Sequence, residues 1–143
     1  MKHYAIVANK TLPSEELVAE VQRCLAEEQC DFYVVVPASH PAGTLTWTES
    51  GDHADAERRL ALVLKRLRAT GIAVDGEIGD TNPMVAITDA LAHRAIDHII
   101  VSTLPTRLSR WLKQDLPHRV RQTFGVPVTH IVATVDDDVE VPA

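Results

Sequence analysis

Five short segments rich in apolar residues, separated by stretches with helical periodicity, restrict this chain more than any other feature of its sequence. They lie at Tyr4–Ala8, Phe32–Val36, Ile72–Ile78, Asp97–Val101 and Val126–Val132. Runs of this kind, rich in β-branched residues, are typical of strands that are buried on both faces of a parallel sheet. Because parallel strands need crossover connections, the alternation predicts an α/β fold, a doubly wound five-stranded parallel sheet with helices on both faces.

Residues that favour helix ends separate these strands from the helices between them. Ser14 and Asn82 can cap helix N-termini with their side-chain oxygens, and Asp115 is expected to cap the last helix in the same way. Gly71 and Gly125 are expected to end helices, because glycine readily adopts the left-handed conformation found at helix C-termini. These signals place four helices between the five strands.

The predicted elements form one domain over residues 1–133, followed by an acidic tail at 134–143 that we expect to be solvated. A long irregular connection runs from Pro37 to His53 and precedes a helix expected over Ala54–Thr70. Connections of this length are usually functional lids or disordered segments. The position of this one, directly after a strand's carboxyl end, favours a lid.

The charge balance limits the partners that the chain can have. Its 143 residues include 14 basic and 20 acidic ones, which gives a net charge of −6. An acidic surface is poorly suited to nucleic acid or to an anionic membrane. No apolar run approaches the roughly 18 residues of a membrane-spanning helix. We therefore expect a soluble, cytoplasmic protein for which neither nucleic acid nor a membrane is the main partner.

The two cysteines, Cys24 and Cys30, are expected to be buried or half-buried thiols. If both lie on the first helix, about 9 Å of helix axis separates them, at roughly 1.5 Å per residue, which is too far for a disulfide bond. A redox or metal-binding role is therefore the weaker interpretation.

The segment Asp97–Arg119 carries most of the information about function. In a doubly wound sheet, ligands bind at the carboxyl ends of the strands, beside the point where the strand order reverses. The loop that leaves the fourth strand contains Arg107, Arg110 and Lys113 in an otherwise acidic chain. Lys10 follows the first strand and is expected to face the same cleft. The function therefore depends on whether these residues hold an anion.

Two common nucleotide-binding motifs are absent. The first strand-to-helix turn, at residues 9–13, contains no glycine. Both the dinucleotide-binding fingerprint and the P-loop need glycines in such a turn, so that the backbone can approach phosphate groups closely. A dehydrogenase with that fingerprint and a P-loop nucleoside triphosphatase are therefore excluded.

Three features, taken in order along the chain, resemble the universal stress protein family. Residues 4–9 (YAIVAN) resemble its first strand, although family members place an acidic residue at the position of Asn9. Residues 79–87 (GDTNPMVAI) resemble the start of its third helix, and residues 108–120 and 124–131 are similar to its last helix and strand. The resemblance covers Tyr4 to Val132. It implies a Rossmann-like sheet of strand order 3-2-1-4-5.

Family members that bind ATP hold its phosphates with backbone amides of a G-x2-G-x9-G-[ST] pattern after the fourth strand, and this chain departs from that pattern throughout. Ser102 replaces the first glycine, Pro105 or Thr106 falls near the second, and Gln114-Asp115 replaces the final Gly-Ser, with one residue fewer between. Proline lacks an amide donor, and bulky side chains keep the backbone away from a phosphate. Asp115 also places a negative charge where a helix N-terminus attracts anions. We expect ATP binding in the family manner to be lost.

An anion could still be bound without glycines, because guanidinium groups hold phosphates and carboxylates bidentately. Of the 14 basic residues, five fall within residues 107–121, against one acidic residue, Asp115. The alternative is a solvated helix face whose charges pair locally. If ATP, AMP or another small anion binds, the candidate residues of the cleft are Asn9, Lys10, Val36, Ser102, Thr103, Arg107 and Arg110.

Catalytic and metal-binding patterns are weak. No G-x-S-x-G motif surrounds Ser102 or Ser109, so a serine nucleophile lacks its usual setting. His40 and His53 bracket the long connection, but their spacing matches no strong metal-ligand pattern. We expect neither a catalytic residue nor a metal site.

The last strand is expected at an edge of the sheet, where an apolar strand can pair with another chain. The resemblance implies a homodimer formed through Val126–Val132. The leading hypothesis is a universal stress protein-like homodimer without catalytic activity, which acts in stress response or regulation. A protein that binds an adenine nucleotide or another anion is the second hypothesis, and a slow phosphohydrolase is the third.

Overall fold

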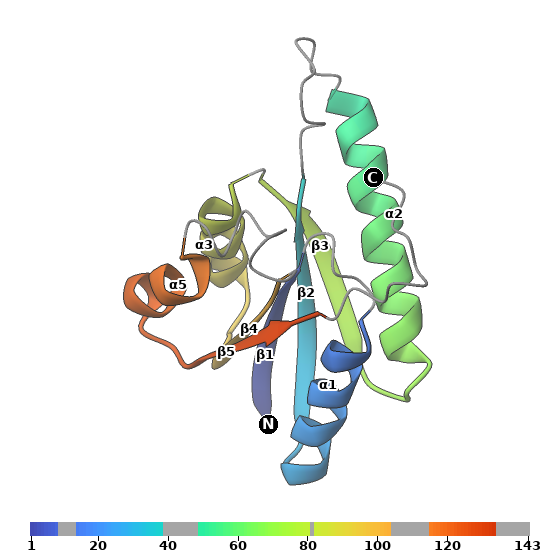
Figure 1. Cartoon of the computed structure of the whole chain (residues 1–143), viewed down its shortest axis with the longest axis vertical. Coiled ribbons are helices and arrows are strands. Elements are labelled where there is room, and N and C mark those ends of the chain that lie inside the picture. The colour runs from blue at the N-terminus through green and yellow to red at the C-terminus, as the bar shows by residue number, and fades with distance from the viewer. Residues whose placement is uncertain (9–13, 39–48, 81, 104–114, 134–143) are drawn as a thin grey trace.

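The computed structural model describes residues 1–8, 14–38, 49–80, 82–103 and 115–133, and of residues 49–55 it describes the backbone alone. Figure 1 shows the helices and strands of these segments. In chain order they are β1 (Lys2–Ala8), α1 (Glu15–Glu27), β2 (Cys30–Pro37), α2 (Glu49–Arg68), β3 (Val74–Gly79), α3 (Pro83–His93), β4 (His98–Thr103), α5 (Leu116–Phe124) and β5 (Val128–Val132). No helix within these segments is both long enough and apolar enough to cross a membrane.

The five strands pair in parallel in the order β3-β2-β1-β4-β5. This arrangement confirms the predicted doubly wound, Rossmann-like α/β fold and its strand order. The order reverses between β1 and β4, and β5 lies at an edge of the sheet as expected. The adjacent carboxyl ends of β1 and β4 are therefore the place where this fold class binds ligands.

Each face of the sheet has its own hydrophobic core, because successive strand side chains point to opposite faces. On one face, Ile6 and Val34 pack with buried residues of α1 and α2, such as Leu17 and Val63. On the other face, the core is built from strand residues and from α3 and α5; its buried members include Val7, Val35, Ile87, Ala90, Leu116 and Val120. Figure 1 shows these two pairs of helices on opposite sides of the sheet.

Three helix ends agree with the residues predicted to form them. The Ser14 hydroxyl accepts a hydrogen bond from the Leu17 amide at 3.1 Å, and the Asn82 side chain accepts one from the Met84 amide at 2.9 Å. Gly125 ends α5 with a φ of 67°. These contacts satisfy backbone groups that a helix end otherwise leaves without partners.

Several predicted boundaries were wrong. Helix α2 begins at Glu49 rather than Ala54, so the irregular connection that was expected to reach His53 ends earlier. The sequence itself permits this earlier start, because acidic residues are favourable in the first turn of a helix and a glycine, here at position 51, costs only about 1 kcal/mol. Strands β3 and β5 each begin two residues later than predicted, at Val74 and Val128.

Asp115 does not cap α5 with its side chain as predicted. It occupies the N-cap position, but its backbone is left-handed, with φ 55° and ψ 43°, and its side chain makes no capping hydrogen bond. Side-chain capping normally requires an extended backbone at that residue, from which the oxygen can reach the next amides. The left-handed conformation of Asp115 therefore explains why its carboxylate does not cap the helix.

Candidate functional site

The point where the strand order reverses is formed by the last residues of β1 and β4. Ala8 pairs directly with Ser102 in the parallel register. The segments 9–13 and 104–114 therefore leave the sheet from neighbouring strand ends. The predicted residues Asn9, Lys10, Arg107 and Arg110 belong to these two segments and lie outside the described residues.

The other three predicted residues are buried in the sheet and do not form one cluster. Val36 and Ser102 are fully buried, and strand alternation places them on the face covered by α1 and α2. Thr103 points to the opposite face, where its hydroxyl lies 2.7 Å from Nε2 of His130. The Thr103 carbonyl also accepts a hydrogen bond from the Ala133 amide. The Thr103 hydroxyl is thus used within the fold.

The start of α5 offers few donors to an anion. Pro117 stands in the first turn and has no amide hydrogen, and Leu116 is buried beside it. Asp115 adds a carboxylate directly before this turn, where its charge opposes that of any incoming anion. Its carbonyl accepts from the Arg119 amide at 3.1 Å, which is the first hydrogen bond of the helix.

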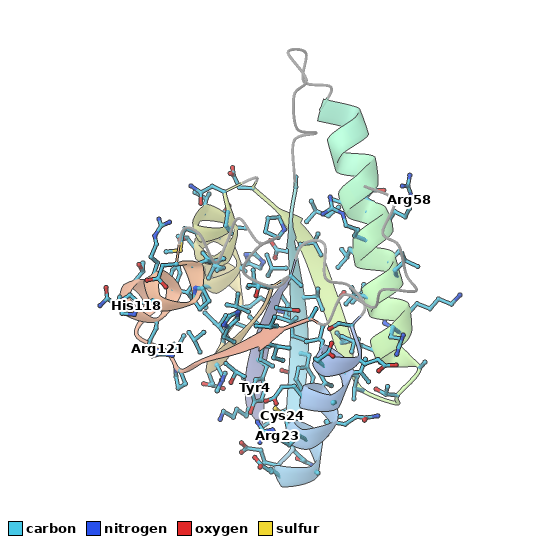
Figure 2. All side chains as sticks on the ribbon, viewed as in Figure 1. Tyr4, Arg23, Cys24, Arg58, His118 and Arg121 are labelled. Atoms are coloured by element: carbon cyan, nitrogen blue, oxygen red, sulfur yellow. The ribbon has the colours of Figure 1, made fainter. Side chains whose placement is uncertain are left out.

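Two of the five clustered basic residues, Arg119 and Arg121, lie on α5, and both are exposed. Figure 2 shows His118 and Arg121 on the outer side of this helix, away from the sheet. These residues match the interpretation of a solvated helix face. They are not gathered at the carboxyl ends of β1 and β4.

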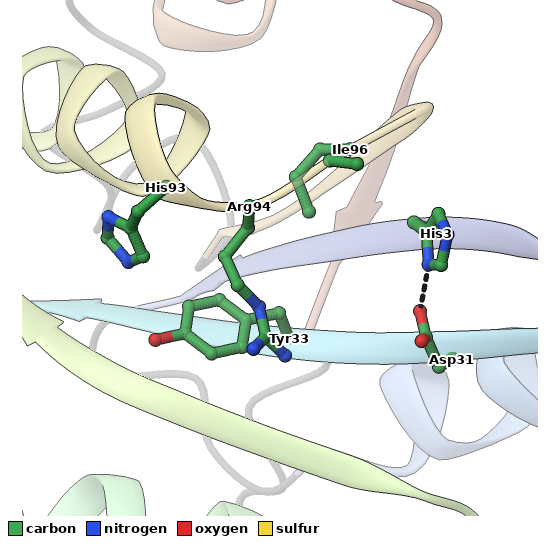
Figure 3. Close-up of a pocket in the computed structure, with 7 residues that line it drawn as sticks. His3, Asp31, Tyr33, His93, Arg94 and Ile96 are labelled. Carbon is green, nitrogen blue, oxygen red and sulfur yellow. Dashed lines mark hydrogen bonds and ion pairs between the residues drawn. The ribbon is translucent and has the colours of Figure 1, made fainter.

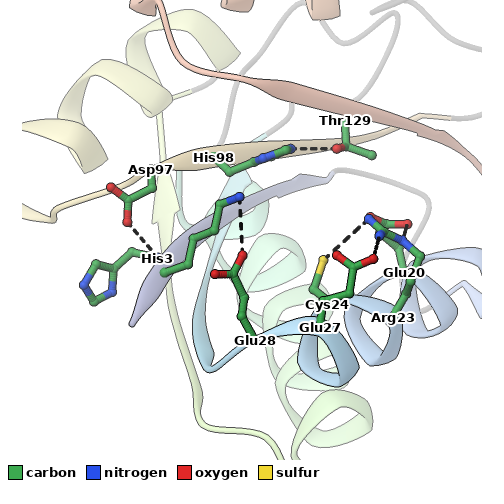
Figure 4. Close-up of polar contacts among 10 residues, drawn as sticks. His3, Glu20, Arg23, Cys24, Glu27, Glu28, Asp97, His98 and Thr129 are labelled. Atoms are coloured by element: carbon green, nitrogen blue, oxygen red, sulfur yellow. Dashed lines mark hydrogen bonds and ion pairs between the residues drawn. The ribbon is translucent and has the colours of Figure 1, made fainter.

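The two cysteines are buried and free, as the composition suggested, but Cys30 begins β2 and is not part of the first helix. Burial raises the pKa of both thiols, which keeps them protonated and slow to react. Cys24 lies in the polar cluster of α1 in Figure 4, where its thiol is 3.6 Å from a Glu20 carboxylate oxygen. Within the described segments, no group of three histidine, cysteine or acidic residues could hold a metal ion.

Two histidines, His98 and His130, are built into the sheet. The His98 ring packs against Tyr4 in a tilted arrangement, with 5.0 Å between ring centres. Its Nε2 lies 2.6 Å from the Thr129 hydroxyl, a contact drawn in Figure 4. Burial lowers the pKa of His98, and also that of His130. The side chains of His40 and His53, which were considered for a metal, lie outside the described residues.

A second polar cluster, which the sequence interpretation missed, lies at the amino ends of the strands. It brings together residues of β1, β2 and the turn between α3 and β4 around a groove of about 300 Å³, shown in Figure 3. The groove is lined by His3, Asp31, Tyr33, His93, Arg94, Ala95 and Ile96. We call it the amino-edge groove. No sequence motif marks it, because its residues come from separate segments and meet only through the strand register.

Together, the fold and the strand ends define a doubly wound α/β domain whose strand order reverses between β1 and β4, the position at which folds of this class bind ligands. No model of a known protein family matches this chain, and no curated protein matches it either. A fold of this class supports many unrelated activities. The function therefore has to be argued from the chain's own residues.

Proposed function

We propose that this chain is a universal stress protein-like regulatory protein that acts through binding or signalling, without catalytic turnover, and that it does not hold ATP in the manner of that family. The strand order agrees with what the resemblance implies. The proposal rests mainly on the start of α5, where the N-cap residue Asp115 is followed by Leu116 and Pro117.

An anion binds a helix N-terminus through free backbone amides and the positive end of the helix dipole. In α5, Pro117 removes one of those amides, and the Asp115 carboxylate partly cancels the dipole. Family-type ATP binding needs both contributions on the side of the triphosphate. Both are weakened here.

Calorimetric titration with ATP and with AMP tests this proposal. We expect no saturable binding of ATP up to millimolar concentration, and no release of phosphate above a buffer blank. Tight, saturable binding of ATP to the parent protein would overturn the proposal, and sustained phosphate release would favour the phosphohydrolase. The variant Asp115→Asn removes one charge with little change of shape. Any weak phosphate binding at α5 should become a few-fold stronger in this variant.

A protein that binds an adenine nucleotide or another small anion is the second candidate function. The pairing of Ala8 with Ser102 favours it, because the segments that carry Lys10, Arg107 and Arg110 start from these neighbouring strand ends. Bidentate arginine contacts could then replace glycine amides. If AMP or ATP binds, Arg107→Ala and Arg110→Ala should weaken it about tenfold or more. Equal affinity in both variants would refute the arginine hypothesis.

We also propose that the chain forms a homodimer through Val126–Val132 and works in the cytoplasm. Strand β5 lies at the sheet edge, and Val132 on it is 44% exposed. An exposed apolar edge strand favours pairing with a second copy. Free buried thiols fit a reducing compartment. Sedimentation at micromolar concentration should give a dimer, and Val132→Lys should shift it toward monomer. A monomeric parent protein would contradict this assembly.

A further inference from the structure

The amino-edge groove lies at the opposite edge of the sheet from the ligand position between β1 and β4. Figure 3 shows Arg94 lying across the face of Tyr33, with His93 on the side of the Tyr33 hydroxyl and the His3–Asp31 pair on the other side. Helix α3 ends at His93, so no helix of the described segments covers the amino-terminal parts of β1 and β2 on this face. Polar side chains occupy this uncovered surface.

Three carboxylates near the groove, those of Asp31, Glu77 and Asp97, already accept hydrogen bonds. Asp97 accepts from the His3 backbone amide at 2.9 Å. Asp31 lies 2.7 Å from Nδ1 of His3. Glu77 accepts from the Tyr33 hydroxyl at 2.6 Å and also contacts Nε2 of His93. Asp31 and Glu77 thereby each orient one imidazole, and the other ring nitrogen of each histidine makes no hydrogen bond with the residues that the structure describes.

Arg94 is held differently. The centre of its guanidinium group lies 4.0 Å from the centre of the Tyr33 ring, which is a cation–π contact. Among the residues that the structure describes, no carboxylate or carbonyl oxygen makes an ion pair or hydrogen bond with this guanidinium. The ring therefore fixes the plane of the group, while its N–H donors remain available along the edges.

We infer that the amino-edge groove is a binding site for a small organic oxyanion, a carboxylate or a phosphate, which Arg94 holds bidentately. The donors that remain in the groove belong to Arg94, and a planar fork of N–H groups matches two oxygens of such an anion. Ala95 and Ile96 line the same groove and give an apolar surface for the rest of the ligand. A volume of about 300 Å³ lies at the lower end of the range of small-molecule sites.

The metal alternative is weaker. The two imidazoles are each paired with one carboxylate, and the described residues offer no set of three ligands at the groove. A cation would also have to lie beside the Arg94 guanidinium, whose charge repels it. The groove therefore fits an anion better than a metal ion.

The test is a titration of the protein with small anions, monitored by NMR through the assigned imidazole resonances of its histidines. The probes are benzoate, phenyl phosphate, acetate and inorganic phosphate. We expect saturable shifts of the His3 and His93 signals with benzoate or phenyl phosphate. Acetate should bind several-fold more weakly than benzoate, and inorganic phosphate several-fold more weakly than phenyl phosphate. The preference between benzoate and phenyl phosphate identifies which of the two anions the site takes.

Three variants make the test specific. Arg94→Gln should weaken binding about tenfold or more, and Arg94→Lys should also weaken it, because lysine keeps the charge but loses the planar fork. Arg66→Gln removes the same charge from an exposed position on α2 and should change the affinity less than twofold. Tyr33→Phe keeps the aromatic ring and should retain binding.

Two results would overturn the inference. One is that no probe gives saturable shifts at His3 and His93. The other is that Arg94→Gln binds as well as the parent protein while its circular dichroism and melting temperature show that it is folded. Shifts confined to the carboxyl ends of β1 and β4, and abolished by Arg107→Ala, would likewise reject this site and support the separate anion-binding hypothesis for the other edge.

Discussion

A short connection brings α3 unusually close to the end of β3, and this contact makes a sharp prediction. The chain passes from β3 to α3 through residues 80–82 alone, so the first turn of the helix lies directly over Gly79. A Cβ atom placed on Gly79 would lie 2.5 Å from Cβ of Ala86 and 3.2 Å from its Cα. Ordinary van der Waals contact begins at 3.4 Å, so the added Cβ would be too close to both atoms of Ala86 and could fit only if the backbone shifted.

Gly79→Ala should therefore destabilise the fold. The backbone of both partners is fixed, because the Gly79 carbonyl accepts from the Ala38 amide at 3.1 Å and Ala86 lies within α3. Overpacking of this kind typically costs about 1–3 kcal/mol. Alanine recovers part of that through its lower backbone entropy, about 0.5–1 kcal/mol. The two ranges leave a net loss of roughly 0–2.5 kcal/mol, and the 2.5 Å distance between the Cβ atoms favours about 1–2 kcal/mol. A loss of this size would lower the melting temperature by roughly 3–8 °C in a domain of this size.

Urea denaturation of four proteins measures the effect and its cause: the parent, Gly79→Ala, Ala86→Gly and the double variant. Ala86→Gly alone should cost about 1 kcal/mol through helix propensity. It also removes the Cβ that Gly79→Ala would meet, so the cost of Gly79→Ala should fall by half or more in that background. If Gly79→Ala is as stable as the parent, or costs the same in both backgrounds, the proposed contact is wrong.

Three further predictions concern groups whose environment is changed by folding. Burial lowers the pKa of His98 in the folded state, so the unfolded chain binds a proton more readily. The free energy of unfolding should fall as the pH drops below about 6.5, the ordinary pKa of histidine. This decrease should become smaller in His98→Gln. If the free energy of unfolding of this variant depends on pH as that of the parent protein does, His98 is not the group responsible. Burial raises the pKa of Cys24 and Cys30, so iodoacetamide should label both slowly in the native protein and fast in urea, whereas rapid native labelling would contradict their burial. Tyr33→Phe removes the hydrogen bond to Glu77 and should cost about 1 kcal/mol in urea denaturation; no measurable change would show that this bond adds nothing.

The fold could be predicted because the strands are buried on both faces. Every residue from Tyr4 to Ala8 is at most 5% exposed, which is why this run contains no polar alternation and reads as a central parallel strand. The start of α2 could not be predicted in the same way, because a glycine at position 51 argues locally against a helix. Likewise, Ala95 continues the apolar spacing of Ile87 and Leu91, but α3 ends at His93 and Ala95 is exposed.

The candidate sites were harder to predict than the fold. The sequence locates the reversal of strand order, and the pairing of Ala8 with Ser102 confirms that position. It does not reveal that Thr103 turns to the opposite face and contacts His130, because that depends on the register between β4 and β5. The amino-edge groove is a stronger case. His3 and Arg94 are far apart in the sequence, and only the parallel register and the length of α3 bring them to one groove.

The length of α3 explains why the amino-edge groove is exposed, but it does not explain the position of Arg94. Eleven residues make a helix about 16 Å long, at 1.5 Å per residue, and the Asn82 cap with Pro83 fixes where it starts. The helix therefore ends before it covers the amino ends of β1 and β2, and the polar character of His3 and Asp31 follows from their exposure alone. The position of Arg94 does not follow in this way, since an exposed arginine after a helix can extend into water. Its contact with Tyr33 instead holds its donors beside the groove, and this is the feature that distinguishes a binding site from ordinary exposed surface.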